Sequence, residues 1–470
     1  MKKCLLIIVL MLLAFEAQAT PKNIIIMIAD GCGDNCFKAA TLYQYGEYEG
    51  QIYDSFPIKL HSSTNLATSV SGHNRHALVP PYATEKVWSD FKYVMDRIPC
   101  SAACATQMAT GIKTYYSAVG VDLDSNNLKN LTEFAGEKGK STGVVTTVNW
   151  NDGTPAGFVA HWPTRSNLEA ISKSMLCDSK LNVIIGCGHP LYDNNGRLRN
   201  IPNYTRVGSE KIWNDFTHNR PTIDGKPVRD IDGDGTPDAW TFLESKDDFV
   251  KLITMPNPPK RVLGTVQVAA TLQLSRNLPD EENEAFKQAI LELPEENTDS
   301  LLATVTPTLP SLDTLALGAL NVLKQNPNGF LVMIEGGAVD WGAHNNFEGR
   351  MIAEQISFNR AVETVVRWIE TNSSWDETML VITSDHETGY ITAPNQADDI
   401  STWHELPHTK KGEMPKLQFN SIHHTCSLVP LYAKGSGSEC FNIFADETDT
   451  RYGRYIQNTE IAQLIFMLWR

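Results

Sequence analysis

Residues 23–29 read Asn-Ile-Ile-Ile-Met-Ile-Ala and stop at Asp30-Gly31-Cys32-Gly33. An unbroken apolar run, rich in β-branched residues and ended by a glycine turn, is typical of a strand buried on both faces of a parallel sheet. Asp30 then follows the carboxyl end of that strand, and open α/β sheets bind their ligands beyond this end. The stretch therefore predicts both a fold class and the edge of the sheet that carries the chemistry.

The same pattern of an apolar run ended by turn residues recurs at 143–148, 182–188, 330–334 and 378–384. A long helix is expected between the last two runs, from about Phe347 to Glu370. Strands that alternate with helices favour right-handed parallel crossovers. We predict an α/β fold with a large, mostly parallel central sheet, helices on both faces, and surface insertions.

The first nineteen residues have the three parts of a secretory signal peptide. Lys2 and Lys3 give a basic start, Leu5 to Phe15 an apolar core, and Ala17-Gln18-Ala19 a small-residue cleavage site. No later stretch is apolar and long enough to span a bilayer. We expect a secreted or periplasmic protein whose mature chain begins near Thr20.

Residues 20–470 are expected to form one catalytic domain. Its insertions are expected near residues 43–97, where periodicity is weak, and near residues 203–259, where the composition is polar and turn-rich. The formal net charge of -15 argues against nonspecific nucleic-acid binding, and we see no nucleic-acid binding module. If such a protein handles anions, it must concentrate positive charge locally.

Eight of the nine cysteines follow the predicted signal peptide. An even number in an oxidising compartment indicates disulfides without fixing their connectivity. Cys177 with Cys187, and Cys426 with Cys440, are candidate local pairs.

Oxygen-bearing side chains follow several of the predicted strands. A single acid in such a place is commonly a helix cap. Four together at one edge of a sheet point instead to a shared ligand. These residues are Asp30, Thr154, Glu335 and Asp385.

Histidines accompany these oxygen ligands. Asp340 and His344 are four residues apart, which places them on one face of a helical turn, and Asp385-His386 and His424 supply further ligands. Any one of these histidines alone is more simply a hydrogen-bonded structural residue. Mixed imidazole and carboxylate sites suit zinc and oxygen-only sites suit magnesium, so the set predicts two Zn²⁺ and one Mg²⁺. Two neighbouring metals fit phosphoryl transfer.

A nucleophile is suggested by the stretch from Pro99 to Thr114. Ser101 opens a run of small, helix-tolerant residues that ends at Gly111. The start of a helix favours an anion, so Ser101 is well placed to meet a phosphate. It is also an ordinary N-cap candidate.

An acidic loop resembles the first half of a calcium site. Asp230, Asp232, Asp234 and Asp238 alternate around glycines, but Thr241 stands where the bidentate acid should be. The loop is either a calcium site or a solvated Asp/Gly turn.

Taken in order along the chain, these motifs resemble those of the secreted and periplasmic bacterial alkaline phosphatases, of the alkaline phosphatase superfamily. The resemblance covers almost the whole mature sequence. It is carried by Ile28-Ala29-Asp30-Gly31, Ser101-Ala102-Ala103, Thr110-Gly111-Ile112-Lys113-Thr114, Thr154-Pro155-Ala156, Ala160-His161, Arg165, Glu335-Gly336-Gly337, Asp340, His344, Thr383-Ser384-Asp385-His386-Glu387-Thr388-Gly389 and His424-Thr425.

The resemblance implies a metal-dependent phosphomonoesterase that acts on small phosphate monoesters as a homodimer. It implies Ser101 as the nucleophile of a covalent phosphoserine intermediate, with Arg165 clamping two phosphate oxygens. The implied metal ligands fall into three groups: Asp340, His344 and His424 for one zinc; Asp30, Asp385, His386 and the Ser101 oxygen for the other; and Asp30, Thr154 and Glu335 for magnesium, with Asp152 beside it.

Two residues depart from the family pattern. Cys100 stands where an aspartate that could orient Arg165 is common, and Trp341 stands where many relatives have Lys or His. The alternatives are a phosphodiesterase or sulfatase of the same superfamily, or a noncatalytic protein that binds metal or phosphate. The sulfatase pattern of Pro and Arg after the nucleophile is missing, and diesterases of this type usually lack the third, magnesium-like site that Thr154 and Glu335 imply.

Overall fold

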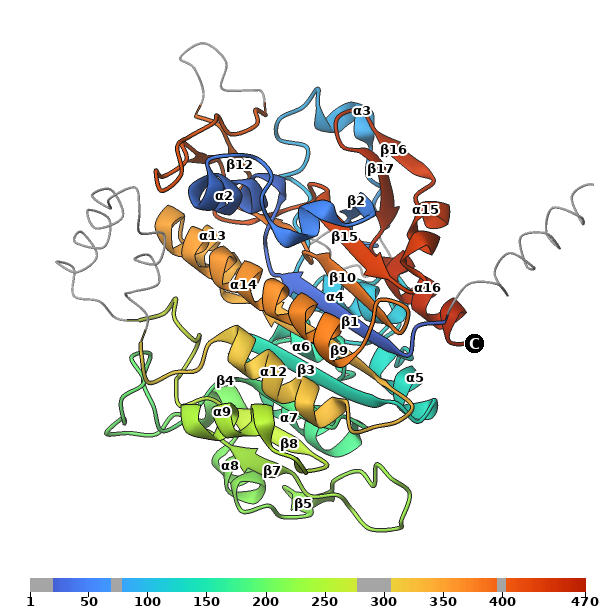
Figure 1. Cartoon of the computed structure of the whole chain (residues 1–470), viewed down its shortest axis with the longest axis vertical. Helices are drawn as coiled ribbons and strands as arrows, with labels where there is room; N and C mark the ends of the chain where they lie inside the picture. Colours follow the sequence, from blue (N-terminus) through green and yellow to red (C-terminus); the bar gives the residue numbers. More distant parts are fainter. Residues whose placement is uncertain (1–19, 69–77, 277–305, 395–402) are drawn as a thin grey trace, which may run out of the picture.

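The computed structural model describes residues 20–68, 78–276, 306–394 and 403–470 (Figure 1). The predicted signal peptide lies outside the described residues. The strands are β1 Asn23–Ala29, β2 Ile58–Ser63, β3 Ser141–Asn149, β4 Val183–Cys187, β5 Thr222–Ile223, β6 Lys226–Pro227, β7 Thr241–Leu243, β8 Val262–Thr265, β9 Phe330–Gly336, β10 Thr378–Thr383, β11 Glu387–Thr388, β12 Ile391–Thr392, β13 Gln418–Phe419, β14 His424–Thr425, β15 Val429–Gly435, β16 Glu447–Asp449 and β17 Gly453–Gln457.

The α-helices are α2 Asp34–Tyr45, α3 Thr84–Val87, α4 Ser101–Thr110, α5 Leu131–Glu137, α6 Gly153–Gly157, α7 Leu168–Lys173, α8 Glu210–Thr217, α9 Lys246–Thr254, α12 Leu312–Leu323, α13 Ala338–His344, α14 Glu348–Asn372, α15 Phe441–Phe444 and α16 Thr459–Leu468. Short 3₁₀ turns cover Ile52–Ser55, Tyr204–Val207 and Ser438–Cys440, and a π turn covers Ser174–Asp178.

One eleven-stranded sheet runs through the molecule in the order β16-β17-β2-β15-β10-β1-β9-β3-β4-β8-β7. Neighbouring strands are parallel from β10 to β7, and β15 is antiparallel to β10. The predicted α/β fold with a large, mostly parallel sheet is confirmed.

Strand β1 lies inside this sheet and is buried on both faces. Ile25 and Met27 pack into the hydrophobic cluster on one face, while Ile24, Ile26 and Ile28 pack into the cluster on the other. This two-sided burial is why the sequence of β1 is apolar at successive positions rather than alternating.

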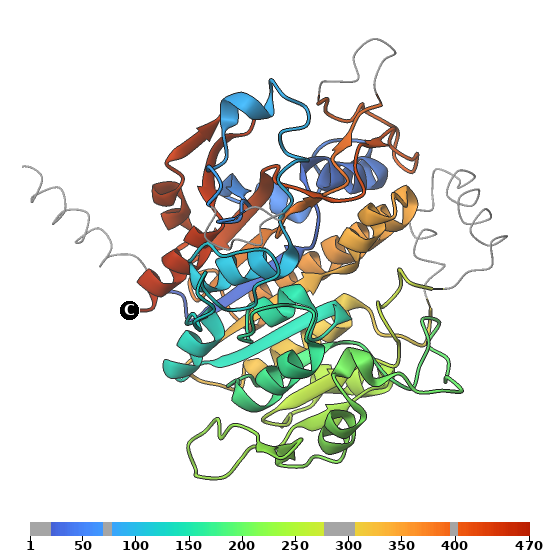
Figure 2. The same ribbon diagram turned by 180° about the vertical axis from the view of Figure 1, so that it is seen from behind.

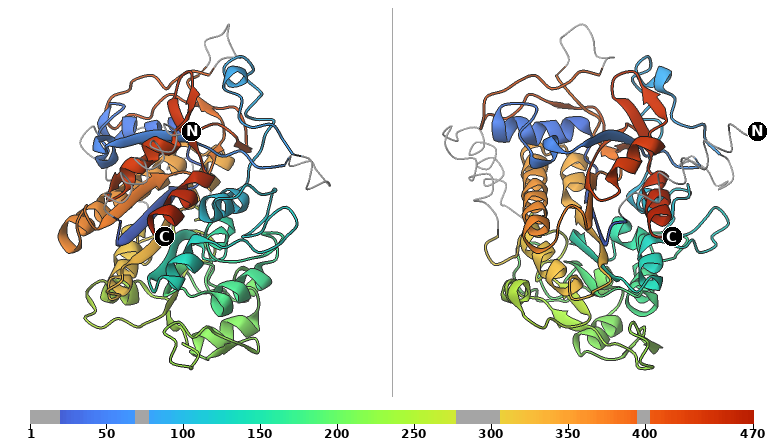
Figure 3. Two further views of the ribbon diagram at one scale, coloured as in Figure 1. Left: turned by 90° about the vertical axis from the view of Figure 1, so that its right-hand side faces the viewer. Right: turned by 45° about the vertical axis from the view of Figure 1, so that its right-hand side comes forward.

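Helices cover both faces of the sheet. One face is packed by α2, α9, α12 and α14, and the other by α4, α5, α7, α8 and α16 (Figures 1 and 2). Figure 3 shows the strands between these two sets of helices. No helix within the described ranges is both long and apolar enough to cross a membrane.

Parts of both predicted insertions belong to the central sheet. Ile58–Ser63 forms β2, which pairs with β15 and β17, and Thr241–Leu243 forms the edge strand β7. Strand β2 alternates buried Ile58 and Leu60 with more exposed Lys59 and His61. This alternating pattern over six residues gives a weaker signal than the continuous apolar runs of the central strands.

The predicted local disulfides are not formed: all eight cysteines in the described part of the chain are free and buried. Cys177 directs its thiol at the carbonyl oxygen of Lys226, and Cys187 directs its thiol at that of Thr147. The two side chains therefore face different partners despite their closeness in sequence.

The turn after β1 ties three elements together. Gly31 has φ +71° and its N–H donates to Asp385 Oδ1 at 3.0 Å. A Cβ atom at this position would lie 2.6 Å from Asp340 Oδ1 and 2.8 Å from the Asp340 Cα. Only glycine allows this close approach of β1 to α13.

We predict that Gly31→Ala lowers the free energy of unfolding by about 2–5 kcal/mol, because a left-handed alanine costs about 1–2 kcal/mol and overpacking adds about 1–3 kcal/mol. Gly225→Ala is the matched control, since Gly225 has φ +79° but no atom lies within 4 Å of its added Cβ. It should lose only the backbone contribution. Urea unfolding measures both losses, and equal losses would contradict the close approach.

Candidate active site

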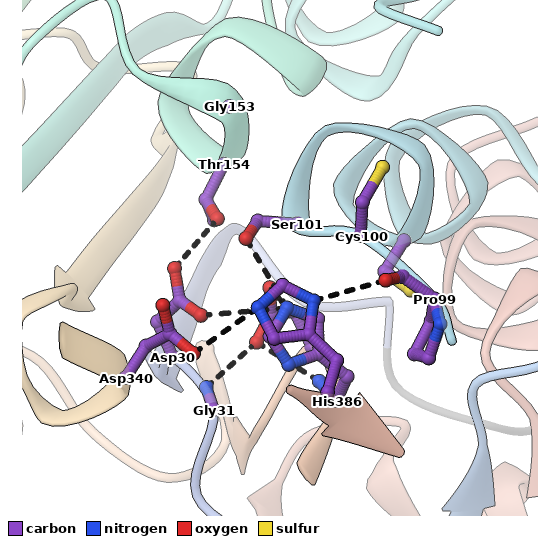
Figure 4. A network of polar contacts seen from close by, with 12 residues as sticks. Asp30, Gly31, Pro99, Cys100, Ser101, Gly153, Thr154, Asp340 and His386 are labelled. Carbon is purple, nitrogen blue, oxygen red and sulfur yellow. Dashed lines mark hydrogen bonds and ion pairs between the residues drawn. The ribbon is translucent and has the colours of Figure 1, made fainter. Parts of the chain in front are cut away.

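The carboxyl ends of neighbouring parallel strands bring the predicted oxygen ligands together. Asp30 follows β1, Glu335 lies near the end of β9, and Asp385 follows β10. Thr154, in the short helix α6 after β3, donates its hydroxyl to Asp30 Oδ2 at 3.3 Å (Figure 4). Thr146 on β3 stands opposite Glu335 in the sheet register and donates to its Oε2 at 2.5 Å.

Three buried carboxylates face one another here. Asp30 Oδ1, Glu335 Oε1 and Asp385 Oδ2 are buried without a hydrogen-bond partner among the described residues. Burial and the neighbouring acids raise the pKa of Asp30 well above its usual range, and burial raises the pKa of Glu335 to about 8 and that of Asp385 to about 6. Buried like charges of this kind are stabilised by a cation.

A second cluster joins helix α13 to strand β14. His344 Nε2 lies 2.8 Å from His424 Nε2 and 3.3 Å from Asp340 Oδ2. His424 Nε2 lies 3.4 Å from Asp340 Oδ1. Burial acts to raise the pKa of Asp340, but the two imidazoles outweigh it and hold that pKa well below its usual range.

The tautomers of these histidines follow from their other ring nitrogen. His344 Nδ1 lies 2.6 Å from the carbonyl oxygen of Ile422, and His424 Nδ1 lies 2.9 Å from that of Pro99. A carbonyl only accepts, so each Nδ1 carries a proton, and each Nε2, which points toward the other ring, is the atom whose lone pair is available to a metal. Two lone pairs and a carboxylate around one point form a ligand set for a metal, with the outer hydrogen bonds typical of metal-bound histidine.

His386 links this cluster to the carboxylates and to Ser101. Its Nε2 lies 3.1 Å from Ser101 Oγ, 3.2 Å from Asp385 Oδ2 and 3.7 Å from Asp30 Oδ1 (Figure 4). Its ring stacks on His424 at a centroid distance of 3.7 Å. Two of the three groups with metal-ligand geometry within the described residues therefore lie here: Asp30, Asp385 and His386; and Asp340, His386 and His424.

Ser101 is the first residue of α4 and is not its N-cap. Cys100 takes that position, and its Sγ accepts hydrogen bonds from Ala103 N at 3.5 Å and Ser117 N at 3.0 Å. The alternative reading of Ser101 as a helix cap is wrong, because the thiol does the capping. The Ser101 hydroxyl instead faces His386.

Arg165 is held by Asp152. Its Nη2 lies 2.6 Å from Asp152 Oδ1, which also accepts from Gly153 N at 2.7 Å. Although burial acts to lower it, Asp152 raises the pKa of Arg165, so the guanidinium stays charged. The backbone N–H of Arg165 donates to the carbonyl oxygen of Ser117, and the backbone N–H of Ser117 donates to Cys100 Sγ. The thiol at position 100 thus fixes the backbone beside Arg165, and the carboxylate that pairs with its guanidinium comes from position 152.

An open pocket of about 370 Å³ lies beside Ser101 and Arg165. Its lining includes a nucleophile candidate, a cation and metal-ligand side chains, which together suit a phosphate group. The lining residues are Asp30, Ser101, Asp152, Arg165, Asp340, Trp341, His344, Asn345 and His424.

Two threonines and a carbonyl were missed from the sequence. Thr388 donates to Asp340 Oδ1 at 2.5 Å, Thr146 orients Glu335, and the Pro99 carbonyl fixes the tautomer of His424. The two threonines are polar residues within otherwise buried strands, and that was the available signal. A backbone carbonyl leaves no trace in the sequence.

The acidic loop lies apart from this pocket. Asp230, Asp232 and Asp234 come close enough together to hold a cation. Asp238 instead accepts from the N–H of Ile231 at 2.8 Å and pairs with the ammonium of Lys260 at 2.8 Å, and Lys260 also contacts Asp232. Calcium binding there stays a prediction.

Comparisons with known proteins agree on one family. The family model described as alkaline phosphatase matches residues 21–195 and 237–449. The chain is 25% identical to alkaline phosphatase 4 of Bacillus subtilis over 87% of this chain and 70% of that protein. It is 26% identical to alkaline phosphatase H of Pseudomonas aeruginosa over 91% of this chain and 83% of that protein.

Two solved structures show the same fold. The alkaline phosphatase of the Antarctic bacterium TAB5 matches with a TM-score of 0.59 and 23% identity, over 96% of this chain and 99% of that one. The cold-active alkaline phosphatase of a psychrophilic Shewanella matches with a TM-score of 0.60 and 21% identity, over 95% and 100%.

The buried carboxylates predict an unusual pH dependence of stability after chelation. A folded-state pKa of about 8 for Glu335 means that the stability contributed by its protonated form is complete below the ordinary value of 4.5 and is lost as the pH rises through 8. Glu335→Gln cannot ionise and keeps an acceptor for Thr146. A shift of one pKa unit corresponds to about 1.4 kcal/mol. At pH 8.5, after metal has been removed with a chelator, the free energy of unfolding of Glu335→Gln should therefore be about 2–4 kcal/mol higher than that of the wild type.

At pH 5 the two chelated proteins should unfold alike, and added Mg²⁺ should stabilise the wild type more than the variant. Calorimetric unfolding measures these differences. A wild type that loses no stability relative to Glu335→Gln between pH 5 and 8.5 would contradict a buried, uncompensated carboxylate.

Proposed function

The chain belongs to the alkaline phosphatase family and is a phosphatase, and from this we propose that it hydrolyses phosphate monoesters through a phosphoserine formed on Ser101. One observation carries the proposal. The Ser101 hydroxyl is aimed at His386, from 3.1 Å, beside a pocket whose lining includes Ser101, Arg165 and one or more members of each metal-ligand cluster: Asp30, Asp340 and His424.

The donor sets fit the metals of the proposal. One zinc would be held by Asp340, His344 and His424, the other by Asp30, Asp385, His386 and the Ser101 oxygen, and magnesium by Asp30, Thr154 and Glu335. The support is the chemistry of these atoms: Nε2 lone pairs that converge on a carboxylate, and buried carboxylate oxygens without a partner among the described residues. Bound metals would supply positive charge to the attacking and leaving oxygens and favour the ionised form of the serine.

Arg165 and the start of α4 position the substrate. A guanidinium matches two phosphate oxygens at once, and its pairing with Asp152 restricts it to one orientation beside Ser101. The first N–H groups of α4 have no partner within the helix and favour an anion at this end. The phosphorus atom is thereby held against Ser101 Oγ, and proximity of this kind supplies much of the rate enhancement.

The reaction then has two displacements at phosphorus. In the first, the bond from Ser101 Oγ to phosphorus forms and the bond from phosphorus to the alcohol oxygen breaks, and the alcohol leaves with a proton. In the second, a water oxygen attacks phosphorus, the bond to Ser101 Oγ breaks, and inorganic phosphate is released. Arg165 binds the phosphoryl oxygens in both steps.

Several wider properties rest on the sequence and the family resemblance. We infer that the signal peptide of residues 1–19 directs export to the periplasm or the exterior, that residues 20–470 act as a single catalytic domain, and that the enzyme is a homodimer.

We predict that Ser101→Ala abolishes the rapid initial release of alcohol that accompanies phosphoenzyme formation and lowers kcat by at least about a thousandfold, because the covalent route is removed. Zinc content, measured by elemental analysis, should stay near that of the wild type. Ser311→Ala is the control, since Ser311 is an exposed serine before α12. Rapid-quench kinetics with a chromogenic monoester tests this, and a wild-type burst from Ser101→Ala would refute the assignment.

A further inference from the structure

A second arginine lies beside the candidate active site. Arg206 belongs to the 3₁₀ turn Tyr204–Val207, which follows the loop after β4. Its guanidinium carbon lies 5.8 Å from the centroid of the Trp341 ring, and Trp341 lines the catalytic pocket. Arg206 is thus placed just outside the wall of the pocket that Trp341 forms.

The guanidinium of Arg206 has N–H groups that donate to no described residue. Its side chain is half-buried and has no hydrogen bond or ion pair to any described residue, although a guanidinium offers five N–H groups. The nearby acid is Asp152, but its Oδ1 already binds Arg165 and the N–H of Gly153. Because the side chain is only partly buried, its N–H groups are open to solvent and to an anion that binds at this place.

The charges around Arg206 favour an anion. Burial acts to lower the pKa of Arg206 and Arg199 acts in the same direction, while Asp152 opposes both. Arg199 is fixed by a hydrogen bond of 2.6 Å from its Nε to the carbonyl of Tyr192. In a chain with a net charge of -15, Arg165 in the pocket lining and Arg206 beside Trp341 place two guanidinium groups on this side of the pocket.

We infer that Arg206, which lies over the Trp341 ring, binds a second anionic group carried by the alcohol portion of the substrate. The preferred substrates are then phosphate monoesters that bear a further phosphate or carboxylate. Arg206 is absent from the lining that contains Ser101, so it contacts the part of the substrate away from the reacting phosphate. Planar guanidinium groups bind both anions through paired hydrogen bonds. This inference rests on the proposed function and adds a specificity-determining residue to it.

The test compares three substrates with the metal-loaded enzyme at low ionic strength: phenyl phosphate, 4-carboxyphenyl phosphate and 1,4-phenylene bisphosphate. The quantity measured is the ratio of kcat/KM for each charged substrate to kcat/KM for phenyl phosphate. Using this ratio removes any effect of a mutation that is common to all substrates. The two charged compounds separate a preference for carboxylate from one for phosphate.

Arg206→Ala should lower at least one of the two ratios tenfold or more relative to the wild type, mainly through KM. Arg206→Lys should recover part of the loss, because it keeps the charge without the planar fork. Added salt should lower the wild-type ratio and leave that of Arg206→Ala nearly constant. Arg229→Ala, which removes an exposed arginine outside the pocket lining, should leave both ratios unchanged.

Three results would overturn the inference. The first is an unchanged pair of ratios in Arg206→Ala. The second is an equal fall in Arg229→Ala, which would reveal only an effect of net charge. The third is a wild type that hydrolyses none of the three monoesters, and this result alone would also overturn the proposed function.

Discussion

The structure depends on the burial of like charges at one edge of the sheet. Asp30, Glu335 and Asp385 come from neighbouring strands and are nearly inaccessible to water. Each has one carboxylate oxygen without a hydrogen-bond partner among the described residues, so the hydrogen bonds from Gly31, Thr146 and Thr154 to the other oxygens offset their mutual repulsion only in part. Such an arrangement is costly for folding and useful for binding cations. This costly arrangement is held in place by the turn at Gly31 after β1. It is also held by Thr146 and Thr388, which orient Glu335 and Asp340.

A thiol stands at position 100, where the family resemblance leads us to expect a carboxylate, and two residues share the task of holding Arg165. Cys100 caps α4 and fixes the backbone of Ser117, which in turn accepts the N–H of Arg165. Among the residues that the structure describes, Asp152 is the acid that pairs with the guanidinium. We expect from the family resemblance that Asp152 lies beside magnesium, and its pairing with Arg165 would then couple the proposed phosphate-binding arginine to the oxygen cluster. Arg206, which we infer to be a specificity-determining residue, lies beyond Trp341 and outside the pocket lining, and it adds a second guanidinium on that side of an acidic chain.

Much of the fold and site could be predicted from the sequence, and the exceptions have physical causes. Central strands such as β1 are buried on both faces and show it as continuous apolar runs, and the acids that follow them meet because parallel strands end at one edge. Strand β2, in contrast, lies within residues 43–97, where the weak periodicity predicts an insertion. The pairing of Asp152 with Arg165 depends on the conformation of the loop that follows α6. The pattern of apolar and polar residues in the sequence does not predict the conformation of a loop. Cysteine spacing predicted disulfides, but side-chain direction decided otherwise.

The most direct test is a crystal structure of the zinc- and magnesium-loaded protein with orthovanadate, recorded with anomalous scattering at the zinc edge. The account predicts one zinc peak among Asp340, His344 and His424 and another among Asp30, Asp385 and His386. It also predicts vanadium bonded to Ser101 Oγ and contacted by Arg165. Zinc at other positions only, or vanadate bound without a bond to Ser101, would contradict it.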